Sequence, residues 1–229
     1  MKTVTGKRLG LAFAMIGAFC TLFVLGIQTG SAASEPGVPD GKQLQFAIFR
    51  DGSEIGSHTI LFSGDEENMT VDIATNVRVA LPLIDIALYK FVHEGHEVWR
   101  NGQLVELTSE TDDDGTAKAV NVTRSGDHLQ VTGSAGVHAS PASIVPASLW
   151  NPALKKSETL LNTLDGTEMA VSISSLGMES IDRKDDRIDA EHIRISGDLE
   201  RDLWYTPDGI LAGIRFLGDD GSEITYILQ

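Results

Sequence analysis

Apolar and polar residues alternate along most of the chain after its first forty positions. In residues 69–79, Met69, Val71 and Ile73 begin a series of apolar side chains, with polar residues such as Asp72 and Asn76 between them. A repeat of two places alternate side chains on opposite faces of a β-strand, and no helix would bury such a pattern. The segment is therefore predicted to be a strand with one face buried and one face in solvent.

Similar alternating runs recur to the C-terminus, and dipeptides typical of tight turns separate many of them. Asn-Gly and Asp-Gly supply the positive φ angles that two-residue hairpin turns require. The turn dipeptides are Asp51-Gly52, Asn101-Gly102, Asp114-Gly115, Asp165-Gly166, Asp208-Gly209 and Asp220-Gly221. We predict a mainly all-β fold, a single antiparallel β-meander. So many strands would expose long edges in a flat sheet, so we expect it to curl into a half-barrel or barrel.

One segment is a candidate for helix. Residues 147–156 hold Leu149, Trp150 and Leu154 around the pair Asn151-Pro152, which suits a helix cap followed by a first helical position. A proline-rich surface crossing with one turn of 3₁₀-helix fits the same residues. The sequence leaves both readings open.

The N-terminal segment resembles an export signal. Lys2, Lys7 and Arg8 precede an uncharged apolar run over residues 9–27, and small residues then lead to a possible cleavage site after Ala33. The run is also long enough to suggest a retained membrane anchor. We expect a cleaved signal at residues 1–33, a flexible lead at 34–41 and a β domain at 42–229. The expected location is the bacterial periplasm or the cell exterior, with membrane contact only through the signal before cleavage.

Charge and cysteine content exclude several classes of function. Lysine and arginine total 18 and aspartate and glutamate total 33, so the net charge is −15, which would repel nucleic acids. The single cysteine, Cys20, lies in the predicted signal. The mature domain would therefore contain neither a disulfide nor a catalytic thiol. No glycine-rich phosphate loop is present, and we expect no cofactor.

Two short segments could hold a cation. His93, His96 and Glu97 could converge on a metal if the chain turns at Glu94-Gly95. The alternative is a pair of exposed hairpin histidines. Residues 112–114, three successive aspartates, could bind Ca²⁺ or form a solvated turn, and their spacing favours the turn.

Residues 81–92 are apolar at both odd and even positions, which indicates a strand covered on both faces. One cover would be the domain core, and the other a bound apolar ligand, a lipid surface, a partner, or an ordinary loop or helix. The candidate lining residues, each of which could equally be part of the core, are Leu83, Ile86, Leu88, Tyr89, Phe91, Trp99, Trp150 and Trp204.

Turn, glycine and aromatic positions along the chain resemble a family of exported bacterial proteins known as domain of unknown function 6134. The resemblance covers residues 44–229 and implies export and β architecture, but no activity. A looser likeness, in overall pattern, is to periplasmic half-barrel proteins that shelter lipids or lipoprotein acyl chains. The residues that carry the family resemblance include Asp51-Gly52, Ile55-Gly56, Glu97-Val98-Trp99, Ser148-Leu149-Trp150, Leu161-Asn162-Thr163-Leu164-Asp165-Gly166, Leu203-Trp204-Tyr205, Phe216 and Ile224-Thr225-Tyr226-Ile227-Leu228.

Taken together, these features predict a periplasmic binding protein without enzymatic activity. Its partner would be an apolar or amphipathic small molecule, such as a lipid, or an envelope protein. One alternative is a hydrolase or metal-dependent enzyme with a site near His93 and His96. Another is a structural component of the envelope with a filled interior and an exposed apolar patch.

Overall fold

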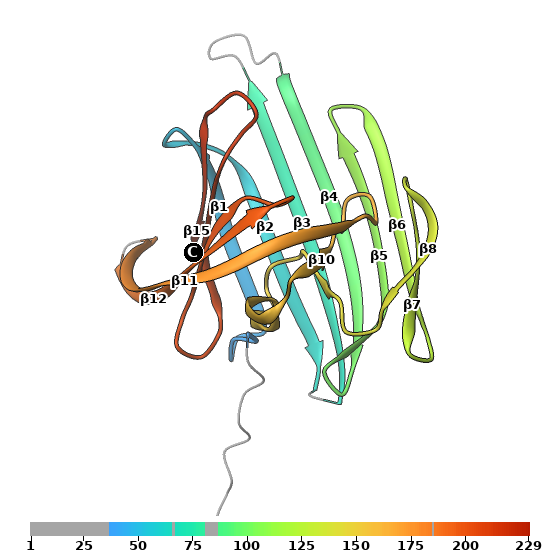
Figure 1. Ribbon diagram of the computed structural model, residues 1–229. Helices are drawn as coiled ribbons and strands as arrows, with labels where there is room; N and C mark the ends of the chain where they lie inside the picture. Colours follow the sequence, from blue (N-terminus) through green and yellow to red (C-terminus); the bar gives the residue numbers. More distant parts are fainter. Residues whose placement is uncertain (1–36, 66, 81–86, 185) are drawn as a thin grey trace, which may run out of the picture. The chain divides into compact units, whose positions relative to one another are not determined.

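The computed structural model describes residues 37–65, 67–80, 87–184 and 186–229. Within these residues, fifteen strands form one sheet in the order β8-β7-β6-β5-β4-β3-β2-β1-β15-β14-β13-β12-β11-β10-β9 (Figure 1). Neighbouring strands are antiparallel except β9 and β10, which are parallel. The predicted all-β meander is confirmed.

The strands differ widely in length. The first eight are β1 (Gln43–Arg50), β2 (Ser53–Gly64), β3 (Asn68–Ala80), β4 (Ala87–Arg100), β5 (Gln103–Asp113), β6 (Thr116–Ser125), β7 (His128–Gly133) and β8 (Gly136–Pro141). The others are β9 (Val145–Pro146), β10 (Thr159–Leu161), β11 (Glu168–Arg183), β12 (Asp186–Gly197), β13 (Arg201–Tyr205), β14 (Leu211–Leu217) and β15 (Glu223–Leu228).

Tight turns form where the sequence predicts them. Asp51-Gly52, Asn101-Gly102 and Asp114-Gly115 each have positive φ at both residues, and they join β1 to β2, β4 to β5 and β5 to β6. Positive φ at two successive positions is the geometry of the hairpin turn whose twist matches that of paired strands. Local sequence therefore fixes these three corners of the sheet.

The turn at Glu94-Gly95 on which convergence of His93, His96 and Glu97 depended does not form. β4 continues through Gly95, which pairs with Ile73 of β3 in an unbroken ladder. Long-range pairing on both sides of β4 holds the glycine in extended backbone, so the local turn tendency of this dipeptide is not realised. The candidate helix contains one 3₁₀ segment, η1 (Pro152–Lys156), capped by Asn151, whose side-chain oxygen accepts from the Ala153 amide at 2.9 Å.

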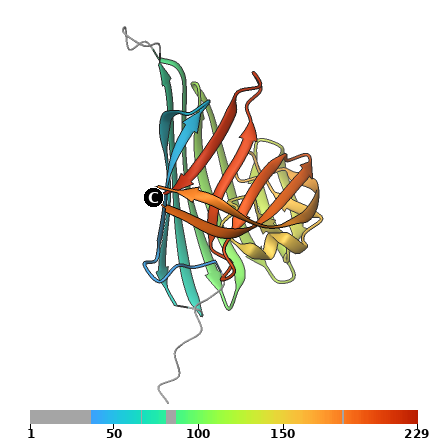
Figure 2. The same ribbon diagram turned by 90° about the vertical axis from the view of Figure 1, so that its left-hand side faces the viewer.

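The sheet does not close by strand pairing among the described residues, and its two edge strands are β8 and β9. Residues 142–167 follow β8 and contain β9, η1 and β10. This segment is tied to the first half of the sheet, because the Ser109 hydroxyl donates to the Thr163 carbonyl oxygen at 2.5 Å and the Ser134 amide to that of Asp165 at 3.0 Å. Gly133 allows the second approach, since a Cβ there would lie 2.1 Å from the same Asp165 oxygen. The strands β11 to β13 lie across the core from β3 to β5 (Figure 2).

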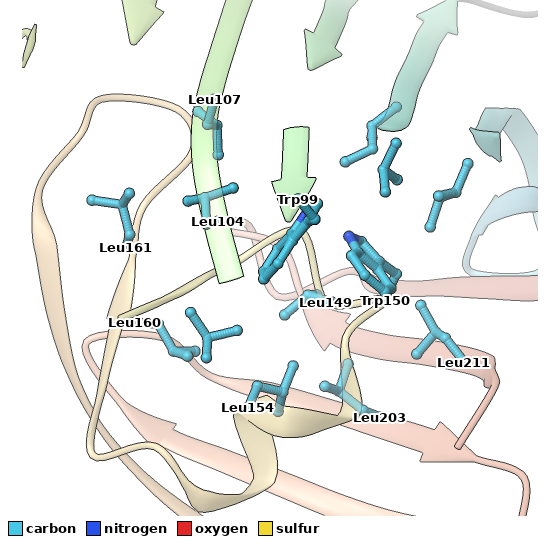
Figure 3. Close-up of a cluster of buried hydrophobic side chains, with 14 of the residues drawn as sticks. Trp99, Leu104, Leu107, Leu149, Trp150, Leu154, Leu160, Leu161, Leu203 and Leu211 are labelled. Atoms are coloured by element: carbon cyan, nitrogen blue, oxygen red, sulfur yellow. The ribbon is translucent and has the colours of Figure 1, made fainter. Parts of the chain in front are cut away.

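A large apolar cluster fills the space between these strands, and Figure 3 shows its leucines and tryptophans packed together. The Trp99 and Trp150 rings meet edge to face with centroids 5.5 Å apart, and the Tyr205 hydroxyl donates to the Leu149 carbonyl at 2.5 Å. Edge-to-face packing is a favoured arrangement of aromatic rings. We call the face of the sheet that carries this cluster the interior face, and the other the outer face.

In the part of the chain that the structure describes, no helix has the length and apolar character needed to cross a membrane.

Candidate functional site

A polar row crosses the interior face of four neighbouring strands. His58 on β2, Thr75 on β3, His93 on β4 and Thr111 on β5 are partners in register. The Nδ1 atom of His58 lies 2.7 Å from the Thr75 hydroxyl, and that of His93 lies 2.8 Å from the Thr111 hydroxyl. All four residues are buried. Because side chains at matching positions on paired strands lie side by side, the register of the sheet builds this row.

Burial keeps both histidines neutral. Removal from solvent lowers the pKa of His58 to about 4, with a further contribution from nearby His93, and burial lowers the pKa of His93 to about 4. The Nε2 atom of His58 is buried and makes no hydrogen bond to the described residues. At neutral pH the row therefore offers polar but uncharged groups.

Aromatic rings extend the row from His58 to an arginine. The Tyr226 ring on β15 lies 5.6 Å from the His58 ring, and the Phe216 ring on β14 lies 6.2 Å from that of Tyr226. The guanidinium carbon of Arg201, on β13, is 3.8 Å from the centre of the Phe216 ring. We define the aromatic–basic row as six residues: Arg201, Phe216, Tyr226, His58, His93 and Phe91, whose ring stacks on His93.

Arg201 is half-buried and lacks a carboxylate partner. Its Nη1 atom donates to the backbone oxygen of Glu200 at 2.7 Å, and within the described residues no carboxylate lies at ion-pair distance. Burial lowers the pKa of Arg201, although not enough to discharge a guanidinium, and burial raises the pKa of Tyr226 to about 12. The row therefore carries one positive charge beside neutral aromatic groups.

The other end of the row lies near the edge of the interior face. The half-buried ring of Phe91 stacks on His93, with centroids 6.4 Å apart. Tyr89 is 37% exposed and its hydroxyl donates to Asp113 Oδ1 at 2.9 Å, while burial raises the pKa of that hydroxyl. Phe91, Phe216 and Tyr226 thus remain in partial contact with solvent, unlike the rings of the closed core.

The predicted lining residues do not form one group. Leu83 and Ile86 lie outside the described residues. Leu88 is 56% exposed, whereas Tyr89 is 37% exposed and Phe91 is half-buried.

The three tryptophans occupy two separate places. Trp99 and Trp150 are buried together in the main core (Figure 3). Trp204 belongs to a second, smaller cluster with Ala190 and Ala212. A ligand in contact with the aromatic–basic row would therefore not be expected to touch all three.

The structure separates the predicted metal ligands. His93 and Glu97 are buried on the interior face, whereas His96 is on the outer face with its Nδ1 atom 2.6 Å from Asp72 Oδ1. The two histidines cannot converge on one cation, because β4 is a continuous strand and successive side chains alternate between faces. Among the described residues, no group of three or more His, Cys, Asp or Glu side chains is placed to hold a metal.

Glu97 is a core residue. It is 1% exposed, and its Oε2 atom accepts from the indole nitrogens of Trp99 at 2.8 Å and Trp150 at 3.0 Å. Burial raises the pKa of Glu97, an effect opposed in part by polar contacts with Ser148 and the two indoles. The carboxyl group joins the two tryptophans inside the apolar cluster.

Asp112 and Asp113 end β5, and only Asp114 of the three aspartates lies in the turn to β6. Asp112 Oδ1 accepts from the Gly115 amide at 2.8 Å, and Asp112 Oδ2 lies 3.1 Å from Lys90 Nζ. Both contacts lower the pKa of Asp112, and the contact with Lys90 has the larger effect. Each oxygen of the Asp112 carboxylate therefore has a partner within the protein.

A charged cluster surrounds Trp204. The ring of His192 stacks on Trp204 at 4.7 Å, its Nε2 atom lies 2.7 Å from Asp202 Oδ1, and its Nδ1 atom lies 3.2 Å from Glu179 Oε1. Burial opposes ionisation of Asp202, but hydrogen bonds from Arg194, His192 and Arg215 lower its pKa to about 2. The cluster borders a hollow of about 300 Å³ and joins β11 to β12, β13 and β14.

The outer face of β2 to β6 has a hollow of about 520 Å³. Its lining includes Asp72, Glu94, His96 and Glu110, and contains no Phe, Tyr or Trp side chain among the described residues. An acidic surface without these large apolar rings does not suit an apolar ligand.

Comparison with known proteins defines the family. The family model described as Domain of unknown function (DUF6134) matches residues 46–229. The chain belongs to this family. A crystal structure described as a beta-barrel-like protein of domain of unknown function DUF1849 from Brucella abortus is similar to the DUF6134 domain, with a TM-score of 0.59 and 12% identity. The match covers 82% of this chain and 95% of that one, and shows a shared fold. No curated protein matches.

Sequence reasoning missed the site role of several residues in the DUF6134 domain. Phe216 and Tyr226 contribute to the family resemblance, but neither they nor Arg201 and His58 were candidate site residues. The signal for Phe216 and Tyr226 is their alternation with polar neighbours, which only places them on one face of a strand. Their proximity to His58 depends on pairing between the first and last strands, which no local pattern specifies.

Proposed function

We propose that this DUF6134 domain is an exported, non-enzymatic binding protein that holds an apolar or amphipathic ligand against the aromatic–basic row. The observation that carries the proposal is the set of half-buried rings on the interior face, Phe91, Phe216 and Tyr226. Binding sites for small molecules combine an apolar lining with a few polar groups. The row has this composition, since buried His58 and His93 lie among its rings.

The chemistry of the row favours binding over catalysis. Its histidines are neutral and hydrogen-bonded to threonines, which are weak nucleophiles without a strong base beside them. The alternative of a metal enzyme near His93 and His96 gains no support, since these residues lie on opposite faces of β4. If the partner is an envelope protein, it would present an apolar group to the same row.

Export is the second part of the proposal and rests on the N-terminal sequence. We expect the full chain, expressed in a bacterium with two envelope membranes, to be recovered from the periplasm. Its mass should be that of a chain whose first residue is Ser34. A cytoplasmic product that keeps its first residues would contradict export. A membrane-bound product of full mass would indicate the anchor alternative instead.

Ligand binding can be tested with a neutral apolar probe. The exported protein should enhance the fluorescence of N-phenylnaphthylamine in a saturable manner, and native mass spectrometry after gentle purification should detect a bound lipid-like molecule. Phe216→Ala should weaken probe binding about tenfold, because a ring contact of roughly 1.4 kcal/mol is lost.

Leu217→Ala is the matched control for this variant. Leu217 is the next residue of β14 and is 68% exposed, so its truncation should leave probe binding unchanged. The proposal fails if the parent protein neither binds the probe nor carries a co-purified molecule.

A further inference from the structure

We propose that Arg201 binds the oxyanion head group of an amphipathic ligand whose apolar chain lies along the rings of the aromatic–basic row. This inference rests on the proposed function and specifies the chemical class of the ligand. Its starting observation is a half-buried guanidinium on the interior face that no carboxylate neutralises.

Other arginines of the domain have acidic partners. Arg194 and Arg215 both contact Asp202, at 2.9 Å and 3.3 Å, and Arg187 contacts Asp182 at 2.6 Å. These three arginines lie on strands close to Arg201 in the sheet, in a chain whose acidic residues outnumber its basic ones by 33 to 18. Arg124 is also half-buried without a carboxylate, but its guanidinium donates to two carbonyl oxygens, those of Leu104 at 2.7 Å and Ala142 at 2.8 Å, whereas among the described residues Arg201 donates only to that of Glu200.

The surroundings of Arg201 compensate its charge only in part. One side of the guanidinium faces the Phe216 ring at 3.8 Å, and Nη1 donates to the Glu200 carbonyl at 2.7 Å. A guanidinium has five N–H donors in one plane, and no other side-chain hydrogen bond of Arg201 occurs within the described residues. A charge removed from water without an opposite charge is costly, so the arrangement is favourable for capture of an anion.

The geometry selects among anions. A planar fork of donors matches the paired oxygens of a carboxylate or a phosphate. The Phe216 ring lies against the guanidinium carbon at 3.8 Å, and the Phe216 and Tyr226 rings together provide an apolar surface that leads away from the fork. A ligand that satisfies both features has an oxyanion joined to an alkyl or acyl chain, as in a fatty acid or a lysophospholipid.

The test compares ligands that share one chain and differ in the head group. Dodecyl phosphate, dodecanoate and dodecanol would each be titrated into the exported protein, with displacement of N-phenylnaphthylamine as the readout. We expect at least one anionic ligand to bind at least tenfold more tightly than dodecanol. The ratio between the phosphate and the carboxylate identifies the preferred head group.

Arg201→Gln should remove this tenfold preference, so that neither anion binds more tightly than dodecanol. Arg187→Gln, which removes an exposed and ion-paired arginine from the end of β12, is the control and should leave the preference unchanged. Arg201→Lys keeps the charge without the planar fork and should retain only part of the preference. If Arg201→Gln does not fold, Arg201→Lys tests the role of the planar fork: a reduced preference supports the inference, and a preference equal to that of the parent protein overturns it.

The outcomes separate the two proposals. Equal binding of dodecanol and both anions by the parent protein overturns the role of Arg201 but leaves the apolar site. An equal loss of all three ligands in Arg201→Gln indicates a structural role for the arginine and also overturns the inference. Absence of binding by every ligand and by the probe refutes the proposed function itself.

Discussion

At the scale of single residues, Glu97 places a carboxyl group where an apolar side chain would be expected. Two indole N–H groups donate to the Oε2 atom of Glu97. Its Oε1 atom and the nearby Ser148 hydroxyl are buried and make no hydrogen bond to a described residue. A buried carboxylate without a positive partner is costly, so burial raises its pKa and favours the protonated acid. The protonated form can fix the relative position of Trp99 and Trp150 without a net charge.

Glu97→Gln tests this account. The raised pKa in the folded state means that the folded protein binds a proton which the unfolded chain, with a pKa of about 4.3, releases. Wild-type stability should therefore fall, relative to the variant, as the pH rises above about 4.3. We expect the stability of the wild type relative to the variant to be lower at pH 8 than at pH 5, as measured by urea unfolding.

Glu94→Gln is the control for this comparison, because Glu94 is exposed on the same strand. Its stability should keep a constant offset from the wild type over this range. A pH dependence of Glu97→Gln identical to that of the wild type would show that the buried carboxyl is not perturbed.

At the scale of elements, the β11–β12 hairpin extends beyond β13 and is held by the cluster around Trp204. The Trp204 indole donates to Glu179 of β11, its ring stacks on His192 of β12, and Ile181 packs against the same small cluster. This cluster is separate from the main core. The far half of the hairpin should therefore be able to loosen without disruption of the rest.

Trp204→Ala should increase amide hydrogen exchange in residues 178–190 and cost roughly 3 kcal/mol of stability. Exchange near Trp99 should change much less. Leu176→Ala, at a 52% exposed position of the same hairpin, should have little effect. A uniform increase in exchange over all strands after Trp204→Ala would mean that the hairpin and the core unfold together.

Elements could be predicted from the sequence where local physics decides them. Asp51-Gly52 and Asn101-Gly102 specify their turns through backbone preference alone, and the Asn151-Pro152 pair correctly starts a short helical segment. Gly95 was misread because strand pairing with β3 and β5 overrides its local tendency.

At the scale of the whole molecule, the candidate site depends on pairing between distant parts of the chain. The pairing of β1 with β15 brings Tyr226 next to His58, although these residues are far apart in the sequence. Alternation in each strand predicts which residues share a face, but not which strands meet or at which register. The sequence could therefore suggest Phe91 as a lining residue but could not place it in one row with Arg201.

The two buried histidines make a prediction for the stability of the whole domain in acid. Their folded pKa of about 4 is depressed below the unfolded value of about 6.5, so their neutral forms contribute stability that is fully present above about pH 6.5. As the pH falls toward 4, the unfolded chain binds protons that the folded domain excludes, and stability should drop by roughly 2–3 kcal/mol per histidine.

A variant with both His58→Gln and His93→Gln should lose much less stability between pH 7 and pH 4.5, even though it starts from a lower value at pH 7. The comparison is sharpest in a Glu97→Gln background, because the carboxyl contributes with the opposite sign over the same range. His128→Gln, at a position with a 41% exposed side chain, should retain the acid sensitivity of its parent. If the double variant lost as much stability in acid as its parent, groups other than His58 and His93 would cause the loss. Removal of these two histidines should otherwise reduce the dependence of stability on pH.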